Sequence, residues 1–125
     1  MKEKIELEYT LNTSPKVLFS RLSTPSGLSE WFADNVNLQG NVFTFVWEGS
    51  EQQAELVSMK EYKSIRFKWI DDKNSNNYFE FRINQDELTG GLALIITDFI
   101  EEDEKDETAE LWDSQIAALK RVLGL

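Results

Sequence analysis

Alternating apolar and polar residues near the start of the chain predict a first β-strand. Between Lys4 and Leu11, every second side chain is apolar, and the side chains between them are mostly charged: Ile5, Leu7, Tyr9 and Leu11 alternate with Lys4, Glu6, Glu8 and Thr10. A two-residue period places one set of side chains on each face of a strand. The pattern therefore predicts a strand over residues 4–11 that is buried on one face.

Two short helices are predicted next, because the same start signal occurs twice. Ser14 precedes Pro15, and Thr24 precedes Pro25. A hydroxyl residue that caps a helix, followed by proline at the first helical position, is typical of a helix start. The apolar positions that follow predict helices over residues 15–22 and 25–32.

Most of the segment between residues 36 and 99 has the composition of β-strands separated by turns. Strands are predicted over 42–47, 52–62, 64–70, 77–84 and 91–99, with a short one near 36–38. The segments 40–41, 48–50, 71–76 and 85–90 are rich in Gly, Asn, Asp and Ser, as turns are. Short connections at regular spacing indicate a meander of antiparallel strands.

The last segment is predicted to be one long amphipathic helix, starting at about residue 103 or 104 and ending at Leu123. Trp112, Ile116, Leu119 and Leu123 recur at helical spacing, and Gly124 suits the helix end. The whole order is β-α-α, then five or six strands, then a long helix. We therefore predict an α+β domain spanning residues 1–125, with a curved antiparallel sheet of six to seven strands around the C-terminal helix.

The residue content excludes several kinds of chemistry. The chain contains no cysteine and no histidine, so thiolate nucleophiles, disulfides, Ser-His-Asp triads and the usual zinc sites are excluded. The net charge of −10 argues against nucleic acid or an anionic membrane as the main partner. No segment has the apolar length of a membrane helix or the form of a signal peptide, so we expect a cytoplasmic protein without membrane insertion.

The negative charge is concentrated between Asp98 and Asp113, where nine acids accompany one base. The run over 101–107 lacks the alternating ligand positions and the turn glycine of an EF-hand loop, so no metal and no cofactor are predicted. Acids at this place are typical of a solvated loop that leads into a helix N-terminus, where the helix dipole favours negative charge.

Fifteen aromatic residues are the strongest chemical signal, and four of them are tryptophans. Several alternate in phase along the predicted strands. Either they fill the core beneath the long helix, or part of the set lines a cavity for a hydrophobic ligand. Tryptophan favours the second interpretation, because its N–H needs a polar partner and is often placed at a cavity wall. The candidate ligand-binding residues are Trp31, Phe43, Phe45, Trp47, Trp69, Phe81, Trp112 and Ile116.

Carboxylates are the candidates considered for acid-base catalysis. By type they are Asp34, Glu48, Glu55, Glu80 and Asp98. Two carboxylates act as acid and base only when their environments separate their pKa values at a fixed distance, which sequence spacing does not show. Glu80 and Arg82 share one face of a strand, so we expect them to form an ion pair. No catalytic residue is predicted.

The order of elements and several motifs resemble the START-like helix-grip (SRPBCC) superfamily, and in particular the homologues of the activator of the heat-shock chaperone ATPase. The motifs are Ser14-Pro15-Lys16-Val17-Leu18-Phe19, Gly27-Leu28-Ser29-Glu30-Trp31-Phe32, a strand ending near Trp69, Glu110-Leu111-Trp112 and Ala118-Leu119. The resemblance implies a hydrophobic pocket between the helix and the sheet, used across the superfamily for lipids, sterols, polyketides and plant hormones.

The chain departs from the catalytic members of that superfamily, because its in-phase positions are almost wholly apolar. We therefore predict non-catalytic binding of a small hydrophobic ligand, lipid-like or aromatic, between the C-terminal helix and the sheet. The alternatives are a protein-interaction module, as a chaperone cofactor or a homodimer, and a small hydrolase or cyclase. A role as a chaperone activator is expected to need a separate N-terminal domain, which 125 residues do not hold.

Overall fold

The computed structural model describes residues 2–70 and 77–125. Its strands and helices follow one another in this order: β1 (Lys2–Leu11), α1 (Pro15–Ser23), α2 (Pro25–Leu28), β2 (Asn35–Gln39), β3 (Val42–Trp47), β4 (Ser50–Lys60), β5 (Ser64–Trp69), β6 (Phe79–Gln85), β7 (Leu92–Glu101), the 3-10 turn η1 (Glu102–Glu104) and α3 (Lys105–Leu123).

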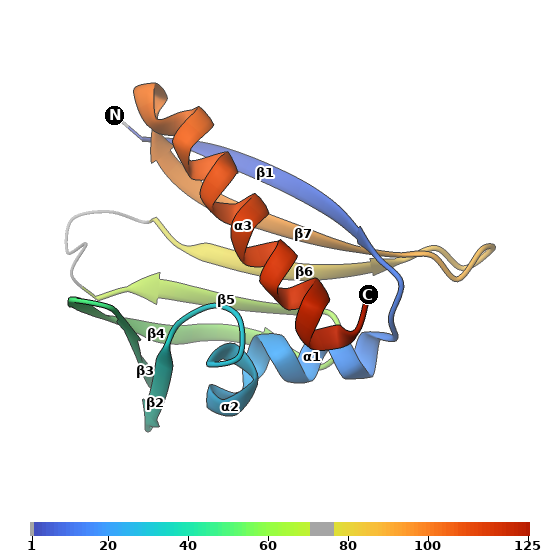
Figure 1. The fold of residues 1–125 in the computed structure, drawn as a ribbon, viewed down its shortest axis with the longest axis horizontal. Coiled ribbons are helices and arrows are strands. Elements are labelled where there is room, and N and C mark those ends of the chain that lie inside the picture. The colour runs from blue at the N-terminus through green and yellow to red at the C-terminus, as the bar shows by residue number, and fades with distance from the viewer. Residues whose placement is uncertain (1, 71–76) are drawn as a thin grey trace.

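The strands form one antiparallel sheet in the order β1-β7-β6-β5-β4-β3-β2. The strands β2 to β7 are neighbours in chain order, as expected for a meander, and β1 adds to the far edge beside β7. The sheet curves, and α3 lies across one of its faces (Figure 1). This arrangement confirms the predicted α+β fold with a curved sheet around a long C-terminal helix.

The face of the sheet that carries the buried side chains, called the inner face below, is the one toward α3. Its strands are held in register by antiparallel pairing, for example of Phe67 with Phe79 and of Phe81 with Ile96. Because the side-chain period is two, this register brings the apolar set of each strand to the same face. The side chains that are at most 1% exposed include Phe43, Phe45, Phe67, Phe79, Phe81, Ile65, Leu94, Ile96 and Leu119.

The second helix is shorter than predicted. The sequence predicts a helix to residue 32, whereas α2 ends at Leu28. The backbone N–H groups of Trp31, Phe32 and Ala33 all donate to the carbonyl of Leu28, so the chain turns around this one carbonyl and the helix does not continue. This turn directs Trp31 and Phe32 into the core, where they are 6% and 4% exposed.

The other boundaries lie within about two residues of the predicted ones, and the difference at the end of β7 has a clear cause. This strand continues to Glu101, because it pairs with β1 as far as Lys2 opposite Glu101. The acidic run therefore starts in a strand, passes through η1 and enters the first turn of α3. The predicted turn at 71–76 lies outside the described residues.

The long helix ends as its sequence predicts. Gly124 adopts a left-handed conformation with φ of 76°, and its N–H donates to carbonyls of the last helical turn. Near the middle of α3, Asp113 Oδ1 accepts a hydrogen bond of 2.7 Å from the Tyr9 hydroxyl of β1. This bond connects the edge strand of the sheet to α3. Over the described residues, no helix is both long and apolar enough to cross a membrane.

Candidate functional site

A pocket of about 800 Å³ lies between α3 and one end of the sheet. It is formed by the loop after α2, by the ends of β3, β4, β5 and β7, and by one side of α3. Its lining residues are Ser29, Glu30, Trp31, Phe32, Ala33, Asp34, Trp47, Gln52, Trp69, Asp98, Thr108, Leu111, Trp112, Gln115 and Ala118. Leu111 is 60% exposed, and Asp34 and Gln52 are also exposed, so the pocket has an open rim.

All four tryptophans of the chain line this pocket. Trp31 and Trp112 are buried, whereas Trp47 and Trp69 are half-buried. The other four candidate residues, Phe43, Phe45, Phe81 and Ile116, are buried in the core beneath and are not among the lining side chains. The structure thus separates the eight candidates into a lining group and a core group, and their role in ligand binding stays a prediction.

Three of the indole N–H groups donate hydrogen bonds that fix the rings. Trp31 Nε1 donates to the carbonyl of Arg21 at 2.8 Å, and Trp47 Nε1 donates to the carbonyl of Phe32 at 2.8 Å. Trp112 Nε1 donates to Asp98 Oδ2 at 3.0 Å. A buried indole N–H requires such a partner, and once it has one the apolar body of the ring is held in a set position. The pocket wall is therefore built from oriented aromatic rings.

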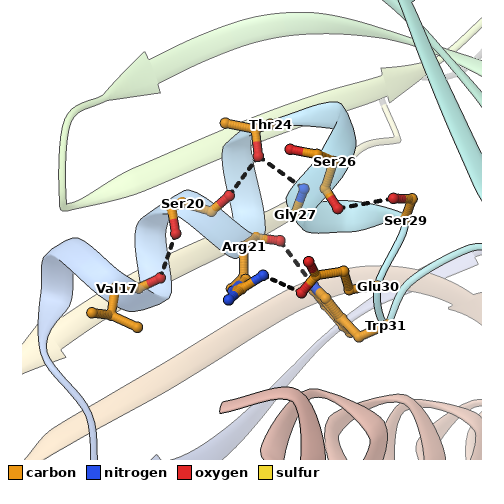
Figure 2. Close-up of polar contacts among 9 residues, drawn as sticks. All are labelled: Val17, Ser20, Arg21, Thr24, Ser26, Gly27, Ser29, Glu30 and Trp31. Atoms are coloured by element: carbon orange, nitrogen blue, oxygen red, sulfur yellow. Dashed lines mark hydrogen bonds and ion pairs between the residues drawn. The ribbon is translucent and has the colours of Figure 1, made fainter.

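Trp31 owes its position to a tightly packed corner between α1 and α2, which Figure 2 shows. The Thr24 hydroxyl donates to the carbonyl of Ser20 and accepts from the N–H of Gly27 at 3.0 Å. A Cβ on Gly27 would lie 2.2 Å from the carbonyl oxygen of Ser20, so only glycine allows α2 to approach α1 this closely. Arg21 of α1 also pairs with Glu30 at the pocket rim.

Phe32 is a central part of the wall that the sequence analysis did not assign to the site. Its ring stacks on Phe79 and on Trp112, with centroids 5.6 and 5.8 Å apart. Its carbonyl accepts both from Trp47 Nε1 and from Gln115 Nε2, the latter at 3.1 Å. The sequence feature that could have assigned Phe32 to the site is its position next to Trp31, because two adjacent large aromatic side chains at a predicted helix end must both be buried against other residues. Nothing in the sequence pattern indicated Gln52, Thr108 or Gln115.

Asp98 is the acid that the register places on the inner face of β7. It lies between the buried Ile96 and Ile100 in the alternation and opposite Ile5 of β1. Burial raises the pKa of Asp98, while the hydrogen bonds from Trp112 and from the N–H of Phe99 and the charge of Lys2 act in the opposite direction. Desolvation is the largest of these effects, so Asp98 is a carboxylate held in an apolar setting.

Of the other candidate carboxylates, Asp34 lines the pocket, at its rim. Glu80 accepts from Arg66 Nε at 2.7 Å and lies 3.6 Å from Arg82 Nε. The predicted pairing with Arg82 is confirmed, and Arg66 is an additional partner. Neither Glu80, Glu48 nor Glu55 is among the residues that line the pocket. Within residues 2–70 and 77–125, no three acidic side chains converge as metal ligands do.

Comparisons with known proteins agree with this fold. The family model of the START-like superfamily domain matches residues 1–125. The chain is 49% identical to the Bacteroides fragilis protein BfR322, with a TM-score of 0.71 over 99% of this chain and 93% of that one.

Two more distant structures share the fold. The Aha1 dimer from Colwellia psychrerythraea has 16% identity and a TM-score of 0.80, with coverage of 94% of this chain and 93% of that one. The Mesorhizobium loti protein MLL2253 has 15% identity and a TM-score of 0.79, with coverage of 98% and 97%. No curated protein matches the sequence. On the family match and the helix-grip architecture together, the chain belongs to the START-like superfamily.

Proposed function

We propose that this protein binds a small apolar ligand, lipid-like or aromatic, in the pocket between α3 and the sheet, without catalysis. The observation that carries the proposal is that all four tryptophans line one pocket of about 800 Å³. This volume is within the range of about 300–1,000 Å³ that is typical of sites for small organic ligands. The core beneath the pocket is closed, so the pocket floor is a fixed surface.

The lining suits binding by apolar burial with a few polar contacts for orientation. The rings of Trp47 and Trp69 are half-buried, so they retain surface that a ligand would cover. Removing apolar surface from water contributes on the order of 25 cal/mol per Å². Thr108, Gln52 and Gln115 are polar lining side chains that would orient a ligand.

Hydrolase or cyclase chemistry is less well supported by the same site. Asp98 already accepts two hydrogen bonds, from Trp112 and from the N–H of Phe99, and these fix its carboxylate as an acceptor. Asp34 is exposed to solvent on the rim. Neither arrangement supplies an activated nucleophile, so binding is the function that the geometry supports best.

Native mass spectrometry tests the proposal on protein purified from its own source without detergent. We expect a discrete non-covalent mass increment on the 14.5 kDa chain, and we expect denaturation to remove it. The protein should then also bind the neutral aromatic probe 1-naphthalenemethanol in titration calorimetry. A bare mass together with no binding of the neutral probe would contradict the proposal.

A homodimer is a second candidate, and the same spectrum tests it. One structural neighbour, from Colwellia psychrerythraea, is an Aha1 dimer. In this chain, Leu38 of β2 and Val57 and Met59 of β4 are large apolar side chains that are 45–53% exposed. An ion at twice the chain mass would support self-association. Service as a chaperone cofactor and a cytoplasmic location stay predictions.

A further inference from the structure

The charges around the pocket favour one class of ligand. Among the described lining residues there are three acids, Glu30, Asp34 and Asp98, and no lysine or arginine. Glu30 is paired with Arg21, whereas Asp34 is exposed on the rim and Asp98 lies in the wall. An anionic head group would therefore meet carboxylates without a lining cation to balance them.

The position of Asp98 is the second observation. It occupies an inner-face position of β7 whose neighbours in the alternation, Ile96 and Ile100, are 0% and 5% exposed. Its Oδ2 accepts from Trp112 Nε1 at 3.0 Å. Its Oδ1 accepts from the N–H of Phe99 at 2.8 Å, so each carboxylate oxygen has one protein donor. Placing a carboxylate among apolar side chains costs desolvation, and an organic cation beside it would offset that cost.

The aromatic rings are the third observation, because they attract the same kind of group. The face of an indole ring carries negative electrostatic potential and binds cations, most strongly when water is excluded. Trp31, Trp47, Trp69 and Trp112 line the same pocket as Asp34 and Asp98. The rings and the carboxylates thus both favour a cationic ligand. The net charge of −10 on the whole chain favours it as well.

We propose that the ligand of this pocket is an organic cation with an apolar body, such as an amine or a quaternary ammonium on an aromatic or alicyclic skeleton. The cationic group lies beside Asp98, with Asp34 on the rim of the same pocket, and the apolar body contacts the tryptophan rings. Lys2, whose charge also acts on Asp98, is not among the lining residues. This inference rests on the proposed function, since it assigns the charge of the bound ligand.

Three probes with one ring system and different charges test the inference. They are 1-naphthylmethylamine, 1-naphthalenemethanol and 1-naphthaleneacetate, which are cationic, neutral and anionic at neutral pH. Each is titrated into the full chain by calorimetry at low and at high ionic strength. We expect the amine to bind roughly tenfold more tightly than the alcohol, and the acetate to bind most weakly.

Two variants with the same change in net charge separate a local effect from a general one. Asp98→Asn removes the charge in the pocket wall, whereas Glu87→Gln removes one in the exposed β6–β7 hairpin, at the opposite end of the sheet from the end of β5 that carries Trp69 (Figure 1). We expect Asp98→Asn to reduce the preference for the amine over the alcohol several-fold. Glu87→Gln should leave both affinities unchanged.

The outcomes distinguish this inference from the function on which it rests. If the alcohol binds and the amine binds no more tightly, or if Asp98→Asn and Glu87→Gln change the preference equally, the cationic assignment is wrong and the binding function stands. If none of the three probes binds, both fail. Thermal melts of the two variants verify that each remains folded during the titrations.

Discussion

The two parts of the space between α3 and the sheet differ in the aromatic residue that builds them. The floor consists of phenylalanines, with Phe43, Phe45, Phe67, Phe79 and Phe81 all at most 1% exposed. The open pocket beside it is lined by the four tryptophans. Phenylalanine has no polar atom and fills a closed core, whereas tryptophan has an N–H that must be satisfied at an edge. Apart from Phe32, which is part of the pocket wall, the type of aromatic ring therefore distinguishes the closed core from the pocket lining.

Neighbouring positions on one strand show the difference most clearly. Phe67 and Trp69 lie two residues apart on the same face of β5, and their cross-strand partners are Phe79 and Ala54. Phe67 is fully buried, while Trp69 contacts Phe79 at a centroid distance of 4.8 Å and otherwise lines the pocket. Across this boundary the same apolar alternation passes from the closed core to the lining of the pocket.

The largest expected effect comes from truncating these two rings. Phe67→Ala should lower the free energy of unfolding by about 3–5 kcal/mol, because it leaves a cavity in a closed core. Trp69→Ala should cost about 1–2 kcal/mol, since less of its surface is buried by the protein, but it should weaken binding of 1-naphthalenemethanol. Urea unfolding measures the change in stability of each variant, and calorimetry measures the change in affinity. Equal losses of stability in Phe67→Ala and Trp69→Ala would contradict the distinction between the closed core and the pocket lining.

The next effect concerns the corner that carries Trp31. Gly27→Ala should destabilise the protein by about 1–3 kcal/mol, because the added methyl group meets the backbone of α1 at Ser20 and Arg21, which cannot move aside as a flexible side chain would. Ser26→Ala, at the exposed neighbouring position, is the matched control and should change stability by less than about 0.5 kcal/mol. Urea unfolding compares the two. If Gly27→Ala left the free energy of unfolding unchanged, the close packing of α2 on α1 at Gly27 would be contradicted.

A smaller effect is expected where β1 meets α3. Tyr9→Phe removes the hydroxyl that donates to Asp113 and should cost about 0.5–1.5 kcal/mol. Burial and the neighbouring carboxylate raise the pKa of Tyr9, so the hydroxyl stays protonated and keeps donating above the pH at which an ordinary tyrosine ionises. The affinity for 1-naphthalenemethanol should be unchanged, because neither residue lines the pocket. A weakened affinity would extend the site to this edge of the sheet.

The smallest effect is a dependence on pH. Because the pKa of Asp98 is raised on folding, the folded chain holds this proton to higher pH than the unfolded chain does. The contribution of Asp98 to stability is therefore present at low pH and is lost as pH rises from the ordinary aspartate pKa, about 3.9, through the raised one. Relative to the wild type, Asp98→Asn should thus gain stability as pH rises, as measured by urea unfolding at constant ionic strength. A difference that stays constant with pH would contradict the burial of this charge.

The sequence predicted the fold well, because the fold depends on periodicity. The strand alternation, the two proline start signals and the Trp112 to Leu123 spacing each fix a local structure, and together they admit one layered arrangement. The end of α2 was placed wrongly, because the turn at residues 29–33 depends on the carbonyl of Leu28 and on the approach of α2 to α1. Such a contact between segments has no local sequence signature.

The site was predictable only in part. The tryptophans were indicated by their type, and the structure places all four in the pocket lining. The alternation of Phe43 and Phe45 is the same as that of Trp47, so periodicity did not separate core from lining. Asp98 was visible only as an acid near a strand end, because its inner-face position depends on where β7 starts and on its pairing with β1. Gln115 and Phe32 come together across 83 residues of sequence.

The most direct test of the account follows the indole signals during a titration. Each of the four tryptophans gives one side-chain peak in a proton–nitrogen NMR spectrum of labelled protein. On addition of 1-naphthalenemethanol, we expect shifts in the tryptophan indole peaks and in the side-chain amide of Gln115, with the backbone amides of Phe45, Phe67 and Leu94 nearly unchanged. Shifts centred on Leu38, Val57 and Met59, or an unchanged spectrum, would contradict the claim that the tryptophan-lined pocket is the binding site.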